Sequence, residues 1–174
     1  MNHERGTAVG GIGRWMMILS WALLLVLLSF LFNDILEKQN NPNQEPLTLQ
    51  DAQGASQVVL QRNRAGHYVA NGRINGQPVL FLLDTGATDV AISDELAKSL
   101  DLPRGRQLIS QTANGTVISW QTRLAEVALG GITLNDVRAS VLPTMTGNEV
   151  LLGMSFLKRL EWTQRGDQLT LKKL

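Results

Sequence analysis

The chain has 174 residues, a formal net charge of +1 and 44% hydrophobic residues, which fits one modest globular domain with a further segment. Its 16 basic and 15 acidic residues are scattered along the chain, and this pattern argues against nucleic-acid binding. The absence of cysteine excludes disulfide bonds, thiolate catalysis and thiolate metal sites. The only two histidines, His3 and His67, are far apart in the sequence, so neither a histidine metal site nor a Ser-His-Asp triad is expected. Any acid-base chemistry would therefore fall to Asp and Glu.

Residues 15–32 form an apolar run, WMMILSWALLLVLLSFLF, that is interrupted only by Ser20 and Ser29. As a helix it is long enough to cross a hydrocarbon core of about 30 Å. It is apolar on every face, which is not typical of a helix that packs on a soluble core. A cleaved signal peptide would have a shorter apolar region and a small-residue cleavage site, which residues 29–34 lack. The run therefore predicts one transmembrane helix at 15–32.

The charges on either side of this helix predict its orientation. Arg5 and Arg14 precede it, whereas Asp34, Glu37 and Lys38 follow it. Positive charges favour the cytoplasmic side, so residues 1–14 are expected in the cytoplasm and the rest of the chain on the other side of the membrane. Residues 33–57 are rich in Asn, Gln and Pro, and this composition predicts a polar linker that does not fold by itself.

Residues 58–174 contain short apolar runs separated by turn signals, which predicts an all-β domain. Hairpin turns are expected at Asn75-Gly76, Asn114-Gly115, Gly130-Gly131 and Arg165-Gly166-Asp167. Two short helices are expected, one over residues 94–100 with Ser93 as its N-cap, the other around residues 155–160. Trp162, near the last hairpin, is expected in the core.

Residues 79–83 (VLFLL) are apolar without alternation, which predicts a strand that is covered on both faces. Asp84 follows this strand directly, so it is a candidate for acid-base chemistry. The tetrapeptide Asp84-Thr85-Gly86-Ala87 resembles the active-site signature of aspartic proteases. Taken alone, Asp-Thr-Gly after a strand is more simply a turn, so the segments that follow the motif decide between the two interpretations.

Two further segments follow the motif in the order found in aspartic proteases. Residues 112–116 (TANGT) match a flap tip, and residues 150–153 (VLLG), followed by MSFL, match the element that passes the catalytic loop. With the membrane helix and the polar linker, the arrangement is similar to that of bacterial retropepsin-like (clan AA) aspartic proteases. The resemblance covers about residues 58–174. It implies a retropepsin-like acid protease single lobe, in a bacterial inner-membrane protein whose protease domain faces the periplasm.

The resemblance assigns catalysis to Asp84, Thr85 and Gly86. In that family the Asp carboxylate works with a second one to activate a water, the Thr hydroxyl locks two active-site loops together, and the Gly permits a tight turn. The substrate-binding residues that it implies are Ala87, Ala113, Asn114, Gly115 and Gly153. Asp-Thr-Gly occurs once in the chain, so we expect a homodimer that cleaves a peptide or protein substrate and needs neither metal nor other cofactor.

Two other functions stay open at this point. A membrane-tethered peptide-binding or scaffold module could keep the protease fold without turnover, although the intact Asp84-Thr85-Gly86 motif favours an enzyme. Self-processing, by a cut within residues 40–50, is neither supported nor excluded by the sequence.

Overall fold

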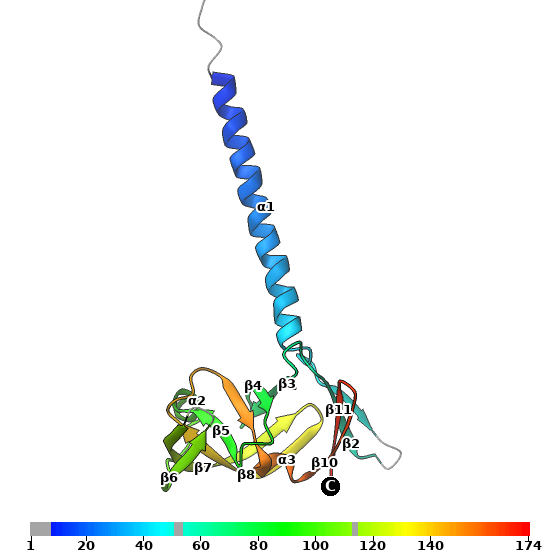
Figure 1. Ribbon diagram of the computed structural model, residues 1–174, viewed down its shortest axis with the longest axis vertical. Helices are drawn as coiled ribbons and strands as arrows, with labels where there is room; N and C mark the ends of the chain where they lie inside the picture. Colours follow the sequence, from blue (N-terminus) through cyan, green and yellow to red (C-terminus); the bar gives the residue numbers. More distant parts are fainter. Residues whose placement is uncertain (1–7, 51–53, 113–114) are drawn as a thin grey trace, which may run out of the picture. The chain divides into compact units, whose positions relative to one another are not determined.

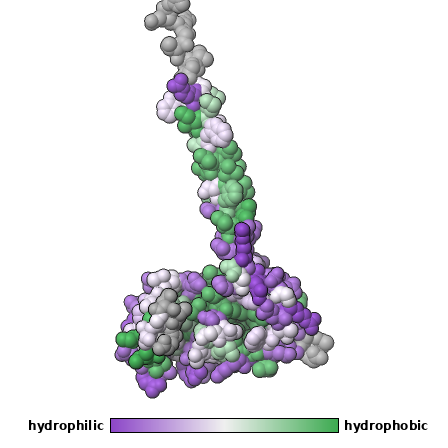
Figure 2. Space-filling view, viewed as in Figure 1, coloured by the Kyte–Doolittle hydropathy of each residue, from purple (hydrophilic) through white to green (hydrophobic). Residues whose placement is uncertain are grey.

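The computed structural model describes residues 8–50, 54–112 and 115–174 (Figure 1). The chain divides into two compact units, residues 1–38 and 39–174. The described part of the first unit is helical and belongs to α1 (Ala8–Asn40). From Gly13 onward this helix is long and apolar enough to cross a membrane, and the apolar side chains along it are exposed (Figure 2). The prediction of a helix that could span a membrane is therefore consistent with the structure.

The second unit is built mainly from strands, which form two sheets (Figure 1). The larger sheet has the order β3-β4-β9-β5-β8-β7-β6. Because β3 also pairs with β7, the sheet closes on itself and leaves β6 as an outer strand. The bounds of its strands are β3 Val69–Ile74, β4 Gln77–Leu83, β5 Val90–Ser93, β6 Gln107–Thr112, β7 Gly115–Leu129, β8 Ile132–Leu142 and β9 Glu149–Leu152.

The smaller sheet is antiparallel and has the order β1-β2-β11-β10. Its strands are β1 Leu47–Gln50, β2 Ser56–Gln61, β10 Leu160–Arg165 and β11 Gln168–Lys173. Val58 and Leu171 face the core and are fully buried. Trp162 lies opposite Leu171 on the edge strand β10 and is 46% exposed, so its assignment to the core was wrong. An edge strand has a neighbour on only one side, which leaves the ring open to solvent.

The all-β fold with one or two short helices is confirmed. Asn75 and Gly76 join β3 to β4 with φ values of 50° and 81°, as a type I′ hairpin requires. Helix α2 (Asp94–Ser99) begins as predicted, and the Leu96 N–H donates to the Ser93 hydroxyl at 3.1 Å. Helix α3 (Met154–Leu157) begins earlier and is shorter than predicted, because β10 already begins at Leu160.

The structure differs from the predicted linker, because most of its described residues are ordered. Helix α1 continues to Asn40, and β1 pairs with β2. Asn43 is buried: its amide donates to Gln61 O at 2.9 Å and Val69 O at 2.7 Å, while its Oδ1 accepts the Gln61 N–H at 2.6 Å. Polar side chains in this segment thus form hydrogen bonds to the ends of strands. The compact unit begins at residue 39 rather than at residue 58. A self-processing cut within residues 40–50 would therefore fall in a segment that is held by Asn43 and by the pairing of β1 with β2.

Candidate active site

Strands β4 and β9 run parallel in the centre of the larger sheet, and their register positions the candidate site. Phe81 lies opposite Val150 and Leu83 opposite Leu152. Asp84 and Gly153 follow these two strands directly, so they emerge next to each other at the same end of the sheet. The Asp84 N–H donates to Leu152 O at 3.3 Å, which continues the pairing by one step. Phe81, Val150 and Leu152 are fully buried, so Asp84 rises directly from the core.

The loop after β4 folds back on the Asp84 carboxylate. The Gly86 N–H donates to Asp84 Oδ1 at 2.8 Å, and the Ala87 N–H donates to Asp84 O at 3.3 Å. A Cβ at Gly86 would lie 3.1 Å from Asp84 Oδ1, closer than ordinary contact. Gly86 therefore leaves room for the carboxylate. Asp84 itself is half-buried, and among the described residues its Oδ2 makes no hydrogen bond.

The segment after β9 passes tightly against this loop. The Met154 N–H donates to Ala87 O at 2.8 Å, and the Ser155 N–H donates to Thr88 O at 2.9 Å. Gly153 is buried here, and a Cβ on it would lie 2.3 Å from Asp89 O and 2.7 Å from Ala87 O. No side chain fits in that space, so glycine is required for the loop and the segment to touch.

Ser155 connects three parts of the site, a role that its sequence context alone does not predict. Its buried hydroxyl accepts the Val90 N–H at 3.0 Å and donates to Arg138 O at 2.7 Å. It thereby joins the start of α3 to β5 and β8. One signal in the sequence could have indicated it: Ser155 is the single polar side chain in the run from Val150 to Leu157.

Asp89 ends the loop beside strand β8. Its buried Oδ1 lies 3.3 Å from Nη2 of Arg138, close enough for an ion pair, although it forms no hydrogen bond among the described residues. The loop is thus held at both ends, by the backbone of β9 at Asp84 and by a side chain of β8 at Asp89.

The structure brings Asp84, Gly86, Ala87 and Gly153 together through the contacts above. Thr85 lies in the same loop with an exposed side chain, and its hydroxyl makes no hydrogen bond within the described part of the chain. Gly115 opens β7 with a φ of 110° and is exposed on the β6–β7 hairpin. Ala113 and Asn114 lie outside the described residues. Over residues 8–50, 54–112 and 115–174, no cluster of three or more acidic or histidine side chains suits a metal ion.

The amino-acid sequence is similar to one protein family and to two bacterial proteins. Residues 70–159, slightly more than half of the chain, match the family model of the gag-polyprotein putative aspartyl protease. An uncharacterized protein in the cobV 5′ region of Sinorhizobium sp. is 36% identical over 126 residues, which are 70% of this chain and 54% of that protein. The uncharacterized protein RP867 of Rickettsia prowazekii is 25% identical over 111 residues, 60% of this chain and 46% of that one. The chain thus matches about half the length of these two relatives.

A solved structure agrees with the fold. The crystal structure of a retropepsin-like aspartic protease from Rickettsia conorii matches with a TM-score of 0.55 and 27% identity. The match covers 67% of this chain and 89% of that one. Both the sequence family and the fold therefore agree with the retropepsin-like fold that the sequence predicts. The chain belongs to the gag-polyprotein aspartyl protease family, as a bacterial retropepsin-like protein.

Proposed function

We propose that this protein is an aspartic endopeptidase that hydrolyses peptide bonds with a water activated by two Asp84 carboxylates. The observation that carries the proposal is the placement of Asp84. Its carboxylate stands at the end of a buried strand, one oxygen accepts the Gly86 N–H, and the other has no partner among the described residues. Two carboxylates that share a site cannot both be ionised, so one holds a proton while the other removes a proton from the water.

The second carboxylate comes from a second copy of the chain, because each chain contains one Asp-Thr-Gly motif. A symmetric homodimer supplies both copies through one self-complementary interface. The exposed Thr85 hydroxyl, which has no hydrogen bond within the described residues, supports this arrangement because it is available to the loop of a second copy. Confinement to a membrane raises the local concentration of chains and so favours pairing.

Helix α1 is the anchor in this proposal. We place it in a bacterial inner membrane as a single pass, with residues 1–14 in the cytoplasm and the protease domain in the periplasm. The arginines Arg5 and Arg14 before the apolar run and the acidic Asp34 and Glu37 after it support this orientation. The substrate would then be a periplasmic peptide or protein.

The test is cleavage of a diverse peptide mixture by the full chain in detergent, from mildly acidic to neutral pH and at several protein concentrations. We expect Asp84→Asn to lower cleavage at least about a hundredfold, because it removes the acid-base group while keeping the size of the side chain. Asp167→Asn is the matched control, since Asp167 is 80% exposed and joins β10 to β11 in the smaller sheet. Cleavage should rise more than linearly with protein concentration while the dimer is incompletely formed.

Cleavage that survives Asp84→Asn would contradict the mechanism. A folded dimer, shown by sedimentation, that cuts no peptide under any of these conditions would contradict the endopeptidase and favour the peptide-binding module instead. Cleavage strictly proportional to protein concentration, with a monomer in sedimentation, would contradict the shared dyad.

A further inference from the structure

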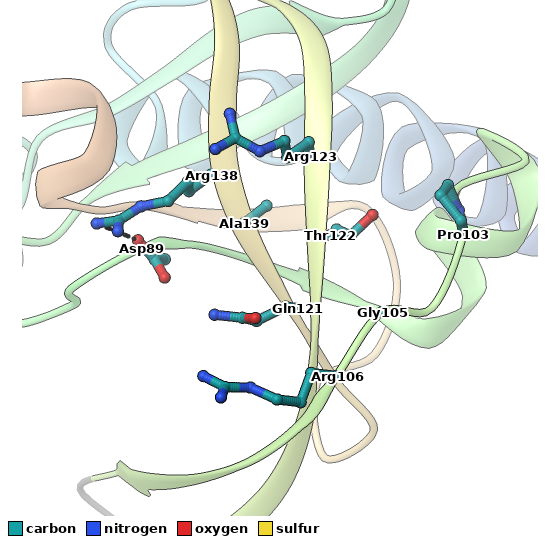
Figure 3. A pocket seen from close by; sticks show the side chains of 9 residues that line it. All are labelled: Asp89, Pro103, Gly105, Arg106, Gln121, Thr122, Arg123, Arg138 and Ala139. Atoms are coloured by element: carbon teal, nitrogen blue, oxygen red, sulfur yellow. Dashed lines mark ion pairs between the residues drawn. The ribbon is translucent and has the colours of Figure 1, made fainter.

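A pocket of about 350 Å³ lies between the catalytic loop, β8 and the base of the β6–β7 hairpin (Figure 3). The loop contributes Asp89, β8 contributes Arg138, and the hairpin contributes Arg106, Gln121 and Arg123. Three arginines therefore line one pocket beside the loop that carries Asp84. The catalytic chemistry above uses none of them.

The charges of these arginines are only partly neutralised. Arg138 faces Asp89 at 3.3 Å, and Arg123 forms an ion pair with Asp136. Arg106 forms no ion pair among the described residues, and neither its guanidinium nor the Gln121 amide has a hydrogen-bond partner there. In Figure 3 the Arg106 guanidinium and the Gln121 amide extend to the same side as the Asp89–Arg138 pair. The pocket thus holds one unmatched positive charge with an amide donor beside it.

The backbone holds Arg106 and Gln121 opposite each other. The Gln121 N–H donates to Arg106 O at 2.9 Å, and the Gly105 N–H donates to Gln121 O at 2.8 Å. A Cβ at Gly105 would lie 2.9 Å from Gln121 O, so glycine permits this close pairing. Opposite residues of an antiparallel pair share a face, so the two side chains are presented together.

This face of the hairpin contacts the body of the domain beside the pocket. The next pair on it is Leu108 opposite Ser119, of which Leu108 is half-buried and Ser119 fully buried. On the other face, Ile109 and Ile118 lie opposite each other and are 77% and 50% exposed. Trp120 on that same face nevertheless packs against the core, so both faces contact the domain, and the pocket borders the catalytic loop because Asp89 lines it.

The pocket is within reach of a peptide bound at Asp84. Asp89 follows Asp84 by five residues in the same loop, so the two lie no more than about 18 Å apart. An extended peptide covers that distance in about five residues. A side chain three to five positions from the cleaved bond therefore lies within reach of the pocket.

We propose that this pocket binds a carboxylate side chain, Glu or Asp, of the peptide substrate, and so selects where the peptide is cut. The inference rests on the proposed endopeptidase function. The planar guanidinium of Arg106 donates two hydrogen bonds to the carboxylate, and the Gln121 amide adds a third. One excess positive charge matches one carboxylate. Arg138 is already paired with Asp89, and this pair holds the wall of the pocket.

The test uses the full chain in detergent and a synthetic peptide library that is randomised at every position. Products are sequenced by mass spectrometry, and the ratio of Glu to Gln is compared with the input at each distance from the cut. We expect Glu to be favoured about tenfold at one position three to five residues from the cut, because a charge-assisted hydrogen bond at a partly exposed site has about this strength. The preference should weaken in high salt, since salt screens the charges.

Two variants and one control assign the preference to the pocket. Arg106→Gln should bring the ratio of Glu to Gln close to one, and Arg106→Glu should favour Lys at the same position, a reversal that misfolding cannot produce. Arg165→Gln removes the same charge from the exposed end of strand β10 and should keep the wild-type ratio. The proposal is overturned if wild type shows no acidic preference at any position, if it favours Lys there, or if both Arg106 variants keep the wild-type ratio.

A binding experiment separates failure of the pocket from failure of the proposed enzyme. The same library is passed over immobilised Asp84→Asn chain, and the retained peptides are sequenced. Acidic enrichment that disappears in the double variant with Arg106→Gln supports the pocket even if wild type cuts nothing. Retained peptides without acidic enrichment, or no retention at all, would overturn the pocket even if wild type cuts peptides and Asp84→Asn does not.

Discussion

Gly153 shows why single residues decide the shape of this site. It follows β9 at the point where the chain touches the loop of Asp84, and a Cβ on it would meet two backbone oxygens, of Ala87 and Asp89. The sequence indicated Gly153 by its resemblance to a family element, but the reason for glycine is a contact between segments that lie far apart in the chain. Such a contact leaves no trace in local periodicity. The same holds for Ser155, whose partners Val90 and Arg138 come from two other strands.

We therefore expect Gly153→Ala to lower the free energy of unfolding by about 3 kcal/mol, because the methyl group must push backbone atoms apart. Cleavage should fall with it, since the Asp84 loop moves. Urea denaturation of the protein in detergent measures the first effect. Gly66→Ala is the control: a Cβ there meets nothing within 4 Å, but its φ of 88° still strains an L residue. It should cost only about 1 kcal/mol. Equal losses in the two variants would refute the steric argument.

Among the secondary-structure elements, the sequence predicted the turns and helix starts that neighbouring residues determine. The Asn75-Gly76 turn and the Ser93 cap of α2 are both present. Helix α3 was misplaced because its first N–H groups bond to Ala87 O and Thr88 O of the Asp84 loop rather than to a local cap. The order of the strands was not predicted at all. The neighbours β4 and β9, and likewise β5 and β8, are parallel and distant in sequence, so no turn signal links them.

Helix α2 gives a prediction about pH. Hydrogen bonds from Lys98 and then Arg104 hold the pKa of Asp94, at the start of the helix, below its ordinary value of 3.8. The pKa of Asp94 is lower in the folded than in the unfolded state. The charged carboxylate therefore stabilises the fold fully at pH values above 3.8, and this stabilisation is lost as the pH falls through the lower pKa of the folded state. Asp94→Asn should therefore lower the Tm at pH 7, and the difference from wild type should close below pH 3.8.

Thermal melts of wild type and Asp94→Asn between pH 7 and pH 2.5 test this. Glu126→Gln is the control, because Glu126 is exposed and forms no ion pair among the described residues. It should follow wild type at every pH. A Tm difference for Asp94→Asn that stays constant down to the lowest pH would contradict the ion-pair explanation.

For the whole molecule, the structure moves the start of the folded unit from residue 58 to residue 39. The composition of residues 41–50 resembles that of disordered segments, and what orders them is a set of bonds to distant backbone groups. The side chain of Asn43 forms hydrogen bonds with the backbone of Gln61 and of Val69, and the backbone O of Asn43 accepts the Asn71 N–H at 3.1 Å. Composition cannot reveal that an asparagine will fit between two strand ends.

Two truncations test this boundary. A chain of residues 39–174 should fold, whereas a chain of residues 58–174 should lose about 3 kcal/mol of unfolding free energy, because buried backbone groups lose their partners. Within 39–174, Asn43→Ala should reproduce most of that loss. The control Asn135→Ala, on the exposed side of β8, should leave the free energy unchanged within about 0.5 kcal/mol. Equal stability of the two fragments would mean that residues 39–57 add nothing to the free energy of unfolding of the domain.

The parallel pairing of β4 with β9 also sets the timing of assembly. Phe81 must find Val150 across most of the domain, and contacts so distant in sequence form slowly because a long loop must first be closed. During synthesis, Asp84 leaves the ribosome well before Gly153 and Ser155, the residues that hold its loop in shape. A growing chain therefore carries the acidic residue without the support that orients it. The loop therefore takes its final shape only after Gly153 and Ser155 have left the ribosome, long after helix α1 has been made.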